Sequence, residues 1–174
     1  MALAVCLLLD PPADGVVRRL WARLEEAGVP SLASHTHGQH VPHLTYAVLR
    51  DWDRGAVVGA LSALPARPPA RLHLDALGLF RRSRCWLAPA LTPDLEPRQH
   101  AVVDAVAATG AELHVHYRPG EWTPHVTLAP RLHLAHLATV AHLVNDVLPL
   151  VAIGSRAVLI DTSTGDQQPL PHLI

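Results

Sequence analysis

The chain of 174 residues contains no lysine, so all 14 of its basic residues are arginine. Ligation that proceeds through a lysine-bound adenylate needs a nucleophilic lysine, and this route is therefore excluded. The sequence also lacks a glycine-rich phosphate-binding loop, a Gly-x-Ser-x-Gly turn and a dinucleotide-binding fingerprint. We therefore expect no cofactor.

Cysteine and long hydrophobic runs are also scarce. Cys6 and Cys85 lie in apolar stretches without the spacing of a metal site, which predicts buried, reduced thiols. The apolar run at residues 2–9 has no basic residue before it and ends at Asp10, so it predicts a buried strand and not a signal peptide. No later run is long enough to cross a bilayer. We expect a soluble, cytoplasmic monomer.

Neither sign of charge predominates. Fourteen arginines face 15 acidic residues, and the net charge is −1 with a pI near 6.9. No overall basic field favours long nucleic acids, so any recognition of phosphate must be local. The composition, 49% hydrophobic, is sufficient for a buried core and argues against disorder.

Hydrophobic patterning predicts the same order of elements in each half: strand, helix, strand, helix, strand, with one more strand in the second half. We therefore predict a single α+β domain over residues 1–174, with two similar lobes related by a pseudo-two-fold axis and formed from halves 1–82 and 83–174. The expected strands cover residues 2–9, 43–50, 71–80, 84–89, 112–117 and 125–129, with a last strand ending near 160, and the expected helices cover 14–27, 53–64, 93–108 and 134–148.

Two stretches of six residues are nearly identical. Residues 42–47 and 124–129 both follow the pattern Pro-His-apolar-Thr-apolar-Ala, and 82 positions separate their histidines. Alternate side chains of a strand share a face. This alternation predicts one polar face with His43, Thr45 and Ala47 in the first copy and His125, Thr127 and Ala129 in the second. The opposite, buried face would contain Leu44, Tyr46, Val48, Val126 and Leu128.

Such a pair of motifs suits hydrolysis of a phosphodiester without a metal. One imidazole can remove a proton from the attacking group while the other, protonated, supplies a proton to the departing oxygen. Threonine hydroxyls two residues further on can donate hydrogen bonds to the phosphate oxygens. The candidate catalytic residues are therefore His43 and His125, and the candidate phosphate-binding residues are Thr45 and Thr127.

These paired motifs resemble those of the 2H phosphoesterase superfamily, which includes 2′-5′ RNA ligase-like proteins and cyclic nucleotide phosphodiesterases. The resemblance implies a bilobal fold with antiparallel sheets lining a central cleft and helices outside. It also implies action on 2′,3′-cyclic phosphates or 2′-5′ linkages, with RNA termini or small cyclic nucleotides as partners and no metal. Any ligase activity would then be the reversal of a transesterification.

The loop before the second motif contains two further candidates. Trp122 is predicted to stack on a base and Arg118 to pair with a phosphate at the cleft rim; the alternatives are a packed loop anchor and a solvated charge. Tyr117 is expected to be a core or edge residue.

Two other functions remain open. A binding module for RNA or nucleotides could keep the same cleft without turnover. A histidine-ligated metal hydrolase is the third possibility, because His35, His37 and His40 precede the first motif closely. No Asp, Glu or Cys lies near these histidines in the sequence.

Overall fold

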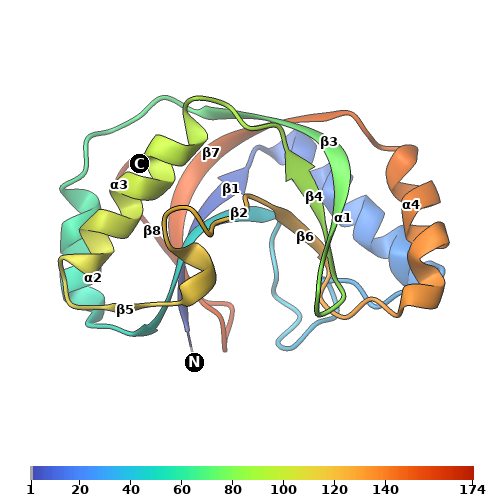
Figure 1. The fold of residues 1–174 in the computed structure, drawn as a ribbon, viewed down its shortest axis with the longest axis horizontal. Coiled ribbons are helices and arrows are strands. Elements are labelled where there is room, and N and C mark those ends of the chain that lie inside the picture. The colour runs from blue at the N-terminus through green and yellow to red at the C-terminus, as the bar shows by residue number, and fades with distance from the viewer. Residues whose placement is uncertain (1) are drawn as a thin grey trace.

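The computed structural model describes residues 2–174 and has the predicted α+β fold (Figure 1). Its helices are α1 (Pro11–Glu26), α2 (Arg54–Ser62), α3 (Leu95–Ala107) and α4 (Leu137–Asn145), with 3-10 turns η1 (Val115–Tyr117) and η2 (Leu134–His136). Its strands are β1 (Leu3–Leu9), β2 (His43–Asp51), β3 (Ala70–Phe80), β4 (Arg84–Pro89), β5 (Glu112–Leu113), β6 (Val126–Ala129), β7 (Leu150–Asp161) and β8 (Gln167–Pro169).

The strands form one antiparallel sheet in the order β1-β2-β6-β4-β3-β7-β8, and β1 also pairs with β7. The long strand β7 pairs with β3 through its first residues and with β1 through its last ones. The change of partner occurs at Gly154, where a side chain would collide with the buried Leu7. The sheet therefore curves into the arch seen in Figure 1.

Helices pack in two pairs at the two ends of the arch (Figure 1). One pair is α1 with α4, and the other is α2 with α3. Each pair takes one helix from each half of the sequence, so the halves 1–82 and 83–174 contribute to both ends of the arch. In helix α1, Val17, Leu20 and Leu24 lie at helical spacing and are buried, so one apolar stripe of the helix faces the core.

Two hydrophobic clusters occupy the two faces of β1. Leu3, Val5, Leu7 and Leu9 belong to the main core beneath the helices, while Ala4, Cys6 and Leu8 form a second cluster with Val158 and Ile160. Both cysteines are buried and free, as predicted. Within residues 2–174, no helix is both long enough and apolar enough to span a membrane.

Several predicted boundaries are wrong. Residues 112–117 form a strand only at Glu112–Leu113, because the side chain of His114 accepts a hydrogen bond from the His116 amide and starts a 3-10 turn. Helix α3 begins after Asp94 and not after Thr92. Residues 134–136 form a separate 3-10 turn, and the polar edge strand β8 was not anticipated.

Candidate active site

One residue pair brings the two motifs together. Leu44 of β2 lies opposite Val126 of β6, and both side chains are fully buried in the main core. In an antiparallel ladder this register sets His43 opposite Thr127 and Thr45 opposite His125. All four side chains then share the face opposite Leu44 and Val126. Directly opposed residues have Cβ atoms about 4.5–5.5 Å apart, and His43 is close enough to His125 to lower its pKa, so we expect the four polar groups to lie close together.

Both motif histidines are oriented by the same local hydrogen bond. The Nδ1 atom of His43 lies 2.6 Å from the carbonyl oxygen of Val41, and that of His125 lies 2.7 Å from the carbonyl oxygen of Thr123. A carbonyl oxygen can only accept, so each Nδ1 carries the proton in the neutral ring. Each Nε2 is then free to accept a proton from a substrate group, or to donate one when the ring is charged.

Burial keeps both imidazoles neutral near pH 7. It lowers the pKa of His43 and lowers the pKa of His125 to about 4, and the hydrogen bond to the preceding carbonyl only partly opposes this. The positive charges of His43 and Arg84 lower the pKa of His125 further. The two imidazoles are therefore within electrostatic reach of each other, and protonation of one disfavours protonation of the other.

Each motif strand contains a β-bulge three residues after its histidine. Cys6 pairs with Thr45 and Val5 with Ala47, so Tyr46 is an extra residue; Trp86 pairs with Thr127 and Cys85 with Ala129, which makes Leu128 the extra residue of the other copy. A bulge reverses the alternation of faces. The prediction that Ala47 and Ala129 line the polar face is therefore wrong: both are fully buried in the main core. Tyr46 is buried there too, as predicted.

A tryptophan indole supports each bulge. Trp122 donates its Nε1 hydrogen to the Thr45 carbonyl oxygen at 2.9 Å, and Trp21 of α1 donates to the Thr127 carbonyl oxygen at 3.2 Å. The Trp122 ring also packs against Tyr46, with 6.3 Å between centroids. Trp122 therefore anchors the loop before the second motif to the first motif strand, and this position does not support the predicted stacking on a base.

Arg118, the other predicted rim residue, is exposed on the same loop. Its backbone amide donates to the Val115 carbonyl oxygen at 3.2 Å, and none of the ion pairs within residues 2–174 includes its side chain. The guanidinium is thus available to solvent or to an anion.

Two aromatic residues beside His125 were not anticipated from the sequence. The Phe80 ring meets the His125 ring edge to face at 5.0 Å, and the Trp86 ring lies 5.8 Å from it. Trp86 pairs with Gly78, where any side chain would collide with the indole, so the ring can lie across the hairpin. Phe80 and Trp86 could be found from the sequence only by predicting the register of the β3–β4 hairpin, because neither residue belongs to a motif.

Tyr117 also belongs to the site and not merely to the core. Burial raises the pKa of Tyr117 to about 12, and the neighbours that modify this pKa are Cys6, Arg84 and Thr45. Thr45 is 7% exposed, and its Oγ1 lies 3.7 Å from Cys6 Sγ. Burial also raises the pKa of the Cys6 thiol to about 12. Near neutral pH the phenol and the thiol therefore keep their protons beside Thr45.

The histidines before the first motif stack on one another. The rings of His37 and His40 lie 4.2 Å apart and those of His35 and His40 5.9 Å apart. Burial and the three neighbouring imidazoles lower the pKa of His40 to about 4. Throughout residues 2–174, no three His, Cys, Asp or Glu side chains converge to form a metal site.

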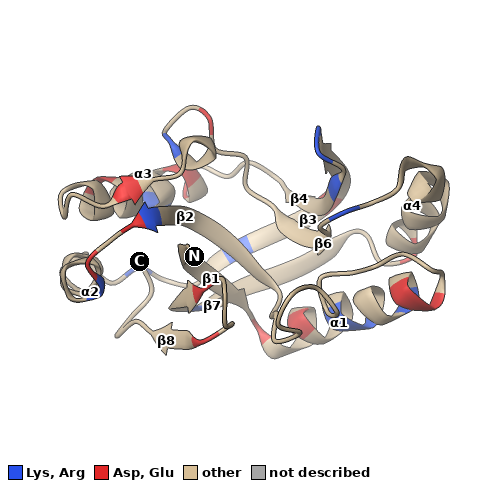
Figure 2. Ribbon diagram, turned by 90° about the horizontal axis from the view of Figure 1, so that it is seen from below, with Lys and Arg blue, Asp and Glu red and all other residues tan. Residues whose placement is uncertain are grey.

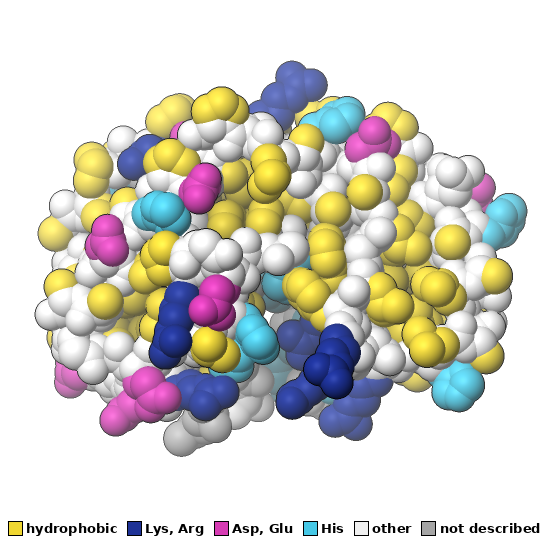
Figure 3. Space-filling view, viewed as in Figure 1, with side chains coloured by type: hydrophobic (Ala, Val, Ile, Leu, Met, Phe, Trp, Pro, Cys, Tyr) yellow, Lys and Arg dark blue, Asp and Glu magenta, His cyan; other side chains and the backbone are white. Residues whose placement is uncertain are grey.

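The space-filling view shows a hollow in this face of the molecule, with histidine side chains inside it and basic side chains around it (Figure 3). The fold and the site thus define an α+β protein with two His-x-Thr strands side by side on one face. The sequence matches the family model of the 2′-5′ RNA ligase superfamily over residues 11–166, and the chain belongs to this superfamily. The resemblance to 2H phosphoesterases is confirmed.

Solved structures share the fold. Escherichia coli LigT complexed with 3′-AMP superimposes with a TM-score of 0.64 and 19% identity, covering 97% of this chain and 93% of LigT. A crystal structure described as a phosphoesterase gives 0.64 and 19%, covering 97% and 94%. Kluyveromyces marxianus Usb1 gives 0.52 and 14%, covering 98% and 97%. No curated protein sequence gives a significant match. The superfamily consists of phosphoesterases and RNA ligase-like enzymes.

Proposed function

We propose that the protein is a metal-independent phosphoesterase that opens 2′,3′-cyclic phosphates or cleaves 2′-5′ linkages at RNA ends or in small nucleotides. The observation that supports this proposal most directly is the Leu44–Val126 pair, whose register puts two imidazoles and two threonine hydroxyls on one face. Among the structural relatives, LigT has been crystallised with 3′-AMP and Usb1 with uridine monophosphate, which supports a nucleotide as ligand.

In the proposed reaction, His43 and His125 are the acid–base pair. The Nε2 of the neutral ring takes a proton from the attacking water or hydroxyl as the new P–O bond forms. The Nε2 of the protonated ring gives its proton to the departing oxygen as the old P–O bond breaks. Thr45 and Thr127 donate hydrogen bonds to the non-bridging oxygens, where negative charge accumulates. The motifs are symmetric, so the substrate's orientation decides which ring is the base.

In the proposed mechanism, the negative charge of the bound phosphate favours protonation of the second histidine ring. Burial keeps both rings neutral in the free protein because it lowers their pKa values. A phosphate anion placed between the rings favours the imidazolium form and raises these pKa values again. One proton is then shared by the pair in the complex. We also propose that Arg118, which is exposed and in no ion pair within residues 2–174, lies at the cleft rim and pairs with a phosphate of the substrate.

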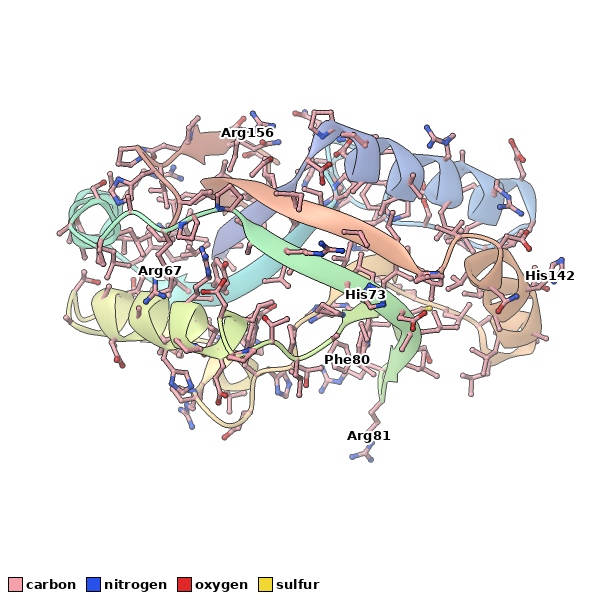
Figure 4. All side chains as sticks on the ribbon, turned by 90° about the horizontal axis from the view of Figure 1, so that it is seen from above. Arg67, His73, Phe80, Arg81, His142 and Arg156 are labelled. Carbon is pink, nitrogen blue, oxygen red and sulfur yellow. The ribbon has the colours of Figure 1, made fainter. Side chains whose placement is uncertain are left out.

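The test is turnover of a panel of 2′,3′-cyclic nucleotides and 2′-5′-linked dinucleotides by the pure protein in EDTA, with the product position identified. His43→Ala and His125→Ala should each lower kcat by roughly 10²–10⁴-fold, because each removes one proton transfer. His142→Ala is the matched control, since His142 is exposed on α4, far from the motifs (Figure 4).

Two other results would each favour one of the alternative functions. Binding of nucleotides without turnover of any substrate would contradict the proposal and support a binding module. Loss of activity in EDTA that only added zinc restores would contradict it in favour of a metal hydrolase.

A further inference from the structure

Four exposed arginines lie together beside the cleft. Arg81, Arg82 and Arg84 lie at the tip of the β3–β4 hairpin, where Phe80 pairs with Arg84 across a tight turn. Arg131 follows β6, and the Leu132 amide donates to the Ser83 carbonyl oxygen at 2.7 Å, which ties this segment to the hairpin tip. We call these four residues the arginine ridge. Figure 4 shows Arg81 projecting away from the end of β3.

In the part of the chain that the structure describes, no ion pair includes an arginine of the ridge. Residues 27–50, 76–93 and 122–145 contain the two motifs, the hairpin and the histidine-rich loop, with five arginines and no Asp or Glu. Their formal charge is therefore +5, and the rest of the chain contributes −6 to the net charge of −1. In Figure 2 the Asp and Glu colour lies mainly on the helices and their ends. The ion pairs within residues 2–174 use other arginines: Arg18, Arg23, Arg54, Arg67 and Arg98.

The ridge is continuous with the catalytic face. Arg84 is close enough to His125 to lower its pKa, and both Arg131 and Arg84 contribute, after burial, to the lowered pKa of His35. Phe80 and Trp86 lie on the same hairpin, with 4.8 Å between their ring centroids, and both contact His125. One hairpin thus presents three arginines at its tip, with Phe80 before them and Trp86 after them, and both rings lie beside His125.

This combination is typical of proteins that bind single-stranded nucleic acid, in which cationic groups contact successive phosphates and aromatic rings stack on bases. A single nucleotide between His43 and His125 contains one reacting phosphate and offers no successive phosphates for Arg81, Arg82 and Arg131. We propose that the arginine ridge binds the backbone phosphates of a single-stranded RNA whose end lies in the cleft, so that the preferred substrate is an oligonucleotide end and not a mononucleotide. The inference rests on the proposed function for the identity of the cleft.

Two measurements test the ridge separately from the chemistry. The first is the affinity for 3′-phosphorylated RNA of one, three and six nucleotides, measured by fluorescence anisotropy at several salt concentrations without turnover. We expect affinity to rise at least tenfold from one to six nucleotides. Arg81→Ala/Arg82→Ala should remove most of this gain and reduce the slope of log K against log salt by about 0.7 for each lost phosphate contact.

The second measurement is kcat/KM for a hexanucleotide ending in a 2′,3′-cyclic phosphate, divided by kcat/KM for the cyclic mononucleotide. The double variant should lower this ratio at least tenfold. Arg19→Ala is the control that should leave the ratio unchanged, because Arg19 is exposed on α1 beside Leu150, which pairs with Leu74 at the end of β3 remote from the hairpin tip. Unchanged unfolding temperatures would show that both variants are folded.

The outcomes separate the two proposals. Length-dependent binding that the double variant abolishes, with no turnover of any substrate, would support the ridge and contradict the proposed function. Turnover with affinities that do not depend on length, or a double variant that binds the hexamer as tightly as the parent, would overturn the ridge alone. Equally tight binding of inorganic polyphosphate of the same charge would also overturn it as an RNA site.

Discussion

At the scale of single residues, the two motif histidines are held identically and buried similarly. Each ring donates through Nδ1 to the carbonyl two positions earlier, and within residues 2–174 no carboxylate is among the groups that shift the pKa of either histidine. In this respect the pair differs from catalytic histidines that an acidic side chain orients. In the proposed mechanism, the proton balance of the site therefore depends on the two rings and on the substrate phosphate between them.

This arrangement predicts an acidic optimum for kcat/KM, which reports the free enzyme. One ring must be neutral and the other protonated, so activity is highest between their two pKa values. Burial lowers both from their ordinary value near 6.5, that of His125 to about 4, and the maximum should therefore lie below pH 6.5. Activity should fall on the acid side as the base is protonated and on the alkaline side as the acid loses its proton.

The measurement is kcat/KM for a cyclic mononucleotide from pH 4 to 8, with full recovery at pH 7 as the control for acid unfolding. The optimum of kcat should lie at higher pH than that of kcat/KM, because the bound anion raises both pKa values. A kcat/KM maximum at or above pH 7 would contradict the assignment of two buried, neutral imidazoles.

At the scale of elements, the bulges explain features of both motifs that alternation alone misses. The threonine just before each bulge has a carbonyl oxygen that accepts a hydrogen bond from an indole, and a buried carbonyl needs such a donor. Trp122, in the loop before β6, and Trp21, in α1, supply these hydrogen bonds. Each bulge also turns the following alanine into the core, where Ala47 and Ala129 are fully buried, so their small size serves packing.

Trp122→Phe tests this explanation. The variant keeps an aromatic ring but leaves the Thr45 carbonyl without its donor, which should lower the free energy of unfolding by about 1–3 kcal/mol. Urea denaturation measures the loss. Trp52→Phe is a suitable comparison, because Trp52 also packs partly buried against the core and makes no side-chain hydrogen bond found in residues 2–174. Equal losses in the two variants would show that the hydrogen bond contributes nothing.

The sequence predicts most elements and the four motif residues because hydrophobic period and the repeated motif are local patterns. It does not predict the bulges, since Tyr46 and Leu128 are apolar residues that suit either face of a strand. Nor does the sequence show which tryptophan lies beside His125, Trp122 or Trp86. Trp122 precedes the motif in the chain but belongs to the core, whereas Trp86 reaches His125 only through the pairing of β4 with β6.

At the scale of the whole molecule, one buried arginine joins parts of the chain that are distant in sequence. Arg98 of α3 is fully buried and donates to Asp94 at 2.7 Å, to the Pro68 carbonyl oxygen at 2.7 Å and to the Ile174 carbonyl oxygen at 3.3 Å. It thereby fixes the segment before β3 and the last residue of the chain against α3, behind the first motif strand.

Arg98→Leu should lower the free energy of unfolding by roughly 2–4 kcal/mol, because both carbonyl oxygens lose a charged donor. Chemical denaturation provides the measurement. Asp94→Asn should have a smaller effect, since the Asp94 side chain is 47% exposed and water can replace the ion pair. The prediction fails if Arg98→Leu unfolds at the same denaturant concentration as the parent.

Binding of RNA by the arginine ridge and cleavage by the histidines should depend on different solution conditions. Guanidinium groups stay protonated at every pH that a folded protein tolerates, and phosphodiesters in RNA are ionised over the same range. Retention of a long ligand should thus respond to ionic strength and hardly to acidity, while bond cleavage responds to acidity through the imidazoles. A cell could therefore slow the chemistry without releasing the strand.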